Sequence, residues 1–251
     1  MLIRTEDDGS AIAIGQPSHA WISGQLARAW GNDRFGAVEP WEEVCLGAEQ
    51  HDVGWSEWDR RPTLNPDTGL PHTFIDLPIE PKIELWSGAA KRLVTQSRYA
   101  AVLVSMHGTG LFERFWPKGA DPDLQRRFLE SEREFQRELL DTLGADPDEV
   151  RRNHLLVRVW DSLSLALCLG WEEIRLDEVP AANGLTALEL KALDAGRVEL
   201  DPWPFARESV GVRAEARRLS DRFDDEAALH TALDEAPWLP LRFELVRRTR
   251  G

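Results

Sequence analysis

Residues 155–165 read LLVRVWDSLSL, and this stretch indicates a helix in the interior of a folded chain. Apolar side chains lie on nearly every side of such a helix, so all of its faces are expected to be buried. Asp161 lies in the middle of the stretch. A buried, ionised carboxylate is unfavourable unless it is paired or bound to a cation. We therefore expect a partner for Asp161, either a bound cation or Arg158 three residues earlier on the same helix.

Three other predicted helices also direct polar side chains toward the interior, because apolar residues recur three and four positions away from each polar one. A single histidine on an apolar face is usually a hydrogen-bonded core residue, and an aspartate can simply close a helix end. Four segments that each aim His or Asp at one core instead favour a metal site, with one or two ions of Fe, Mn or Zn. The polar positions are His19 on the helix from Ser18 to Trp30, His51 and Asp52 on the helix after Glu39-Pro40, and His107 on a helix of residues 98–115.

The order of these elements predicts a mainly α fold. Residues 1–15 read as a β-hairpin, and residues 16–170 as an all-helical metal-binding core, in which Asp-Pro pairs at 121–122 and 146–147 begin the two longest helices. Residues 171–251 alternate between apolar and polar side chains, except for a short helix near 225–233. We expect this last part, with the N-terminal hairpin, to form a small antiparallel β appendage whose exposed edges would permit a homodimer.

Composition narrows the class of protein. The chain has 30 basic and 44 acidic residues, for a net charge of −14. Such a charge disfavours nucleic acid and anionic membranes as partners, since phosphate contacts need Lys and Arg. The start of the chain lacks the apolar stretch of a signal peptide. The sequence also contains no run of about 18 apolar residues, the length needed to span a bilayer, so we expect a cytoplasmic protein. Cys45 and Cys168 lie in apolar helical patterns and are expected to be buried thiols.

The candidate ligands resemble the HD-domain superfamily in their order: a His on one helix, an adjacent His-Asp pair on the next, and a distant Asp in a buried helix. In this sequence these are His19, His51-Asp52 and Asp161. The resemblance implies that all four ligate one metal, and that Asp52 bridges to a second metal held by His72 and His107. His72 lies on a predicted loop, so a mononuclear site without it stays open. Two short segments around these residues also resemble the family's motifs: His51-Asp52-Val53-Gly54 and Trp160-Asp161-Ser162-Leu163.

The sequence as a whole also resembles a bacterial family known as domain of unknown function 3891, which implies no activity. Three stretches carry that resemblance: SGQLARAW at residues 23–30, QHDVGW at residues 50–55 and DPWPF at residues 201–205.

The HD-domain resemblance implies a metal-dependent hydrolase that acts on a small phosphoester, with Asp52 orienting a metal-activated water. Trp55 stands where many hydrolases of that superfamily have Lys. With Trp58 it could line an aromatic pocket for the substrate, and Arg60 is a candidate cation beside it. Two alternatives stay open: a di-iron oxygenase with the same ligands, and a non-catalytic, metal-stabilised scaffold or sensor.

Overall fold

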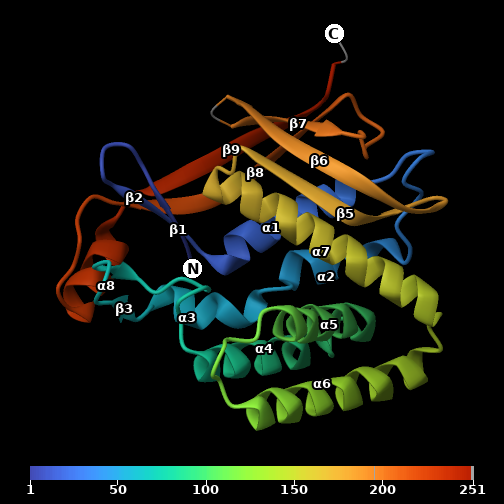
Figure 1. Ribbon diagram of the computed structural model, residues 1–251, viewed down its shortest axis with the longest axis horizontal. Helices are drawn as coiled ribbons and strands as arrows, with labels where there is room; N and C mark the ends of the chain where they lie inside the picture. The colour runs from blue at the N-terminus through green and yellow to red at the C-terminus, as the bar shows by residue number, and fades with distance from the viewer. Residues whose placement is uncertain (195, 250–251) are drawn as a thin grey trace.

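The computed structural model describes residues 1–194 and 196–249, and it places one large sheet against a stack of helices (Figure 1). The helices are α1 (Gln16–Ala29), α2 (Trp41–Gln50), the 3-10 turn η1 (Val53–Trp55), α3 (Ser56–Arg60), α4 (Ile79–Leu93), α5 (Arg98–Arg114), α6 (Pro122–Leu143), α7 (Pro147–Leu169) and α8 (Glu226–Glu235). The strands are β1 (Leu2–Thr5), β2 (Ala11–Ile14), β3 (Leu64–Asn65), β4 (Leu70–Pro71), β5 (Glu173–Ala181), β6 (Gly184–Asp194), β7 (Arg197–Asp201), β8 (Ser209–Leu219) and β9 (Trp238–Arg247).

The long helices begin where the sequence predicts. Asp121 and Asp146 each accept a hydrogen bond from the backbone N–H two residues later, and a proline follows each of them in the first turn. These contacts satisfy N–H groups that have no partner inside the helix, which is why Asp-Pro starts α6 and α7. Both helices end at a glycine, Gly144 and Gly170, in the left-handed conformation that closes a helix C-terminus.

The large sheet has seven strands in the order β1-β2-β8-β9-β7-β6-β5, and it is strongly curled into a half-barrel. Its neighbouring strands are antiparallel, except that β7 runs parallel to β9. The N-terminal hairpin belongs to this sheet, because Ala11–Ile14 pairs with Ala216–Leu219 of β8. Strands β3 and β4 form a separate two-stranded ladder.

The sheet and the helices share their interior. The apolar side of the sheet lies on α1, which packs against β8, and on α7, which packs against β5 and β1. One core cluster runs through both layers and includes Ile14, Leu26, Trp160, Leu188 and Phe243. Figure 1 shows the layers in order, with the sheet at one side, α1, α2 and α7 next to it, and α4, α5 and α6 farther away.

The predicted fold class, mainly α with a small antiparallel β appendage, is therefore wrong, because the protein is mixed α/β. Two features of the strands explain the error. A register shift between Leu176 and Val179 interrupts the alternation of β5, so the sequence pattern of that strand is weak. The parallel pairing of β7 with β9 joins residues that are 47 positions apart, such as Arg197 and Glu244, which no local pattern reveals.

No helix among residues 1–194 and 196–249 combines the length and the apolar character needed to cross a lipid bilayer. Cys45 and Cys168 are both buried free thiols.

Candidate metal centre

Five of the six predicted ligands meet in the interior of the helical layers. Each is at most 9% exposed, so water has little access to any of them. The ligand atoms fall into two groups, each within 4.8 Å of one another: His19, His51 and Asp161, and His51, Asp52 and His107. We call these five residues the ligand cluster: His19 on α1, His51 and Asp52 at the end of α2, His107 on α5 and Asp161 on α7.

His51 is held by the last turn of α2. Its Nδ1 donates a hydrogen bond to the Ala48 carbonyl oxygen at 2.8 Å, which turns Nε2 toward the cluster. Nε2 is buried, has no hydrogen-bond partner, and lies 3.4 Å from Oδ1 of Asp161 and 3.7 Å from Oδ2 of Asp52. Burial alone would lower the pKa of His51, but the two carboxylates outweigh it and raise the pKa to about 9. The two acidic groups thus require a positive charge at Nε2, which a proton or a metal ion can supply.

Asp52 is fixed by two donors. Its Oδ2 lies 2.9 Å from Nε2 of His19, and its Oδ1 accepts a hydrogen bond from the indole Nε1 of Trp86 at 3.2 Å. Burial would raise the pKa of this carboxyl, but the charge of His51 and the hydrogen bond from His19 hold it well below its usual range. Asp52 therefore stays ionised, as a metal ligand must.

Asp161 finds its partners among the histidines and not on its own helix. Arg158, the alternative partner, instead lies 3.7 Å from Glu178 on β5. Oδ1 of Asp161 lies 3.4 Å from His51 and 3.8 Å from His19. Burial opposes ionisation, yet His51 and the other imidazoles lower the pKa of Asp161. The interior carboxylate of residues 155–165 thus faces the imidazoles of the ligand cluster and not Arg158.

His107 brings a neutral imidazole to the cluster. Its ring centroid lies 4.5 Å from that of His51. Burial, followed by the charge of His51, lowers the pKa of His107 to about 4. Its Nδ1 is buried without a hydrogen-bond partner, and so is Nε2 of His51. Buried nitrogens with no partner are unfavourable unless a ligand satisfies them, so these donors fit a divalent metal.

The sequence does not reveal the part played by Trp86. Its indole reaches Asp52 because α4 lies directly on the turn that follows the His-Asp pair, where a Cβ on Gly54 would collide with the carbonyl oxygen of Leu85. Glycine at position 54 therefore allows the two backbones to touch. Trp86 also packs edge-to-face on Trp55 at 5.6 Å and on Phe112 at 5.0 Å. The Gly in His51-Asp52-Val53-Gly54 is the available signal, but it does not identify which helix approaches.

The remaining predicted site residues lie outside the ligand cluster. His72 follows β4, is half-buried, and has its Nδ1 3.0 Å from the hydroxyl of Thr63. Trp55 is fully buried and packs on the half-buried Trp58 at 5.6 Å, so it belongs to an aromatic core. Arg60 is exposed and lies 3.5 Å from Glu57.

The chain matches one family model, described as "Protein of unknown function (DUF3891)", over residues 1–221. No curated protein matches it, and no solved structure does.

Proposed function

Since the chain belongs to the family of unknown function DUF3891, whose description names no activity, we propose its function from the site: a metal-dependent hydrolase that acts on a small phosphoester. The observation that carries the proposal is the pair of buried, unpartnered imidazole nitrogens, Nε2 of His51 and Nδ1 of His107, beside two ionised carboxylates. Histidine and carboxylate donors together suit Fe, Mn or Zn.

One ion accounts for the donors better than two. Both groups of ligand atoms contain His51. The Nδ1 of His51 is engaged with the Ala48 carbonyl, so only Nε2 is free, and a single nitrogen lone pair binds one ion. The di-iron oxygenase would need a second metal, and His72, the ligand expected for it, hydrogen-bonds with Thr63 instead.

In the proposed hydrolase, the residues around the site have separate roles. A bound divalent cation supplies Lewis acidity, lowering the pKa of a water to near neutrality and neutralising charge on phosphoryl oxygens. Trp86 holds Oδ1 of Asp52, and His19 holds Oδ2, so the carboxylate has one orientation. An ionised carboxylate held in this way can accept a hydrogen bond from a water and orient it. Ser164 supports the same arrangement, because its hydroxyl lies 2.9 Å from Nδ1 of His19.

The choice of phosphoesters as substrate rests on the HD-domain resemblance, which the family match does not address. The resemblance lies in the order His19, His51-Asp52 and Asp161, whereas the curled sheet packed on α1 and α7 is a feature of this chain. The geometry of the cluster therefore supports the proposed metal binding, and the ligand order supports the proposed reaction.

The test combines elemental analysis with an assay. Protein purified without a metal-chelating tag is analysed for Fe, Mn and Zn, and then assayed with a panel of phosphomonoesters and phosphodiesters. We expect about one equivalent of metal, and turnover that is lost in His51→Ala. His230→Ala is the matched control, because His230 lies on α8 and contacts the Pro62 carbonyl oxygen. Metal without turnover would favour the scaffold or sensor, and protein that neither contains nor takes up metal would overturn the proposal.

A further inference from the structure

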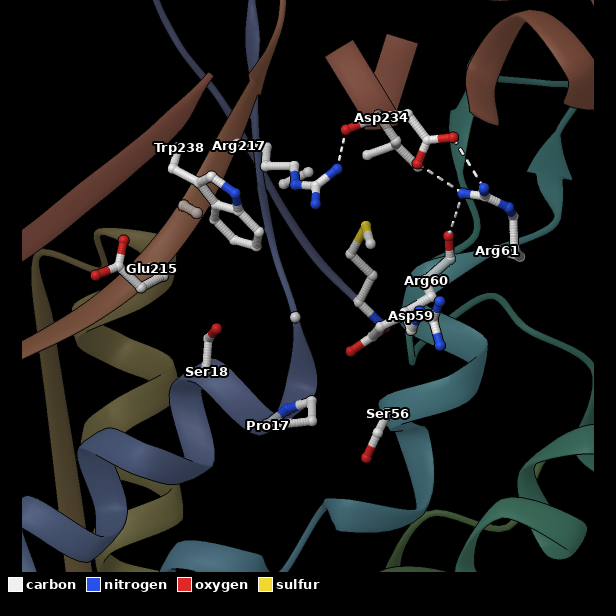
Figure 2. Close-up of a pocket in the computed structure, with 15 residues that line it drawn as sticks. Pro17, Ser18, Ser56, Asp59, Arg60, Arg61, Glu215, Arg217, Asp234 and Trp238 are labelled. Carbon is white, nitrogen blue, oxygen red and sulfur yellow. Dashed lines mark hydrogen bonds and ion pairs between the residues drawn. The ribbon is translucent and has the colours of Figure 1, made fainter. Parts of the chain in front are cut away.

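A second polar region lies where the end of the sheet meets the start of α1. It is a pocket of about 370 Å³, within the size range of small-molecule sites. Its walls come from α1, α3, the α8–β9 turn and strands β2 and β8 (Figure 2). We call it the arginine pocket after the three arginines that line it: Arg60, Arg61 and Arg217.

Two carboxylates of the arginine pocket are already compensated. Asp59 lies 2.9 Å from the ammonium group of Met1 and accepts a hydrogen bond from the backbone N–H of Gln16. Asp234 accepts two hydrogen bonds from Arg61, both at 2.8 Å. Figure 2 shows the pair of Asp234 and Arg61 at the edge of the pocket. A ligand would therefore meet little free negative charge from these two groups.

Arg217 is the arginine of the pocket that forms no ion pair among the described residues. Its guanidinium donates a hydrogen bond to the carbonyl oxygen of Leu233 and lies over the indole of Trp238, 4.2 Å from the ring centroid. Within residues 1–194 and 196–249, no carboxylate lies at ion-pair distance from it. The two contacts hold the side chain in one position, so binding an anion would cost little of its conformational freedom.

Trp238 offers an aromatic surface beside this charge. The residue is 63% exposed, although it is a large apolar side chain. Figure 2 places its indole on the same side of the pocket as Arg217, with Ser18 below it and Arg60 on the opposite side. A guanidinium stacked on one face of an exposed indole is suited to a molecule with an anionic group and a flat ring.

We propose that the arginine pocket binds a small, ring-bearing carboxylate or phosphate, with Arg217 contacting the anion and Trp238 the ring. Arg60, which lies 3.5 Å from Glu57, lines the opposite wall. Glu215, exposed on β8 two residues before Arg217, also lines the pocket, so the rim carries charges of both signs. The site is separate from the ligand cluster, since the described residues that line it include no member of that cluster.

The pocket and the ligand cluster are nevertheless neighbours along the chain. Ser18 lines the pocket and is followed by His19, and Ser56 lines it one turn after Asp52. The test must therefore distinguish an anion held by Arg217 from an anion held by a metal.

Isothermal titration calorimetry with phenylphosphonate, which carries a ring and an anion and is not hydrolysed, provides that test. We expect wild-type protein to bind it, Arg217→Ala to bind at least tenfold more weakly, and Arg217→Lys to fall between them. Arg213→Ala is the matched control, because Arg213 lies on the same strand, is exposed, and faces Trp21 instead of the pocket. Trp238→Leu should weaken phenylphosphonate more than inorganic phosphate. Circular dichroism of each variant checks that the fold is retained.

His51→Ala separates this proposal from the proposed function. If the pocket binds the anion, His51→Ala retains phenylphosphonate binding while it loses metal. If His51→Ala abolishes binding, the anion was held by the metal, which overturns the pocket and supports the metal centre. No binding to wild-type protein, or equal binding by Arg217→Ala, would overturn the pocket and leave the metal centre untouched.

Discussion

The ligand cluster and the arginine pocket both gather acidic and basic side chains, but they balance charge in opposite ways. In the cluster, two ionised carboxylates face three buried imidazoles, and two of the imidazole nitrogens lack hydrogen-bond partners. In the pocket, the buried carboxylate Asp59 and the exposed Asp234 each have a cationic partner, whereas Arg217 and Glu215 have no ion-pair partner among the residues that the structure describes. The difference is the basis of the two proposals: a cation for the carboxylates of the buried cluster, and an anion for the arginine at the open rim.

The largest expected effect comes from breaking the cluster at its carboxylate on α7. Asp161→Asn keeps the shape of the side chain but removes the charge that faces His51. Because removing one partner of a buried charged set costs about 3–5 kcal/mol, we expect metal affinity to fall by about 100- to 4,000-fold. Competition titration against a metal-binding dye measures it. An Asp161→Asn protein that retains full metal occupancy would contradict the assignment of this residue as a ligand.

The next effect tests the close approach of α4 to the cluster. Gly54→Ala places a methyl group against the carbonyl oxygen of Leu85, which is backbone and cannot rotate away. We expect the free energy of unfolding to fall by about 3 kcal/mol, the upper end for an overpacked interior. Urea denaturation measures it. Gly88→Ala is the control, because Gly88 lies on α4 with open space where the added methyl group would stand, and it should not destabilise the protein. Similar losses of unfolding free energy in both variants would show that the close contact between Gly54 and Leu85 is not the cause.

Trp86→Phe tests the donor that no sequence pattern identifies. Phenylalanine keeps the edge-to-face packing on Trp55 and Phe112 but cannot donate to Oδ1 of Asp52. Loss of a hydrogen bond that orients a metal ligand typically lowers affinity by about 10–100-fold. We expect a decrease of about tenfold in the same dye titration. Trp58→Phe, which changes an indole that packs on Trp55 without reaching Asp52, should leave the affinity unchanged. Equal affinities in wild type and Trp86→Phe would mean that His19 alone positions Asp52.

These residues also show how far sequence reasoning extends. The sequence predicts one shared interior for His19, His51, Asp52, His107 and Asp161, because each lies in register with apolar neighbours on its own helix, and a helix period is a local property. Trp86 reaches the cluster only through the packing of α4 on η1, and the curled sheet depends on the pairing of β7 with β9 and of β2 with β8. Such contacts join distant segments, so no window of the sequence contains them.

The smallest expected effect lies at the rim of the arginine pocket. Arg61→Ala removes the partner of Asp234, and both side chains are 54% exposed, so water can solvate the carboxylate that remains. We expect no measurable change in the melting temperature and no change in metal content. The side-chain hydrogen bonds from Arg61 lower the pKa of Asp234. Removing them in Arg61→Ala should therefore raise this pKa, which NMR titration of the Asp234 carboxyl carbon detects. A clear loss of stability would mean that the rim of the pocket, like the ligand cluster, depends on charge pairing that water cannot replace.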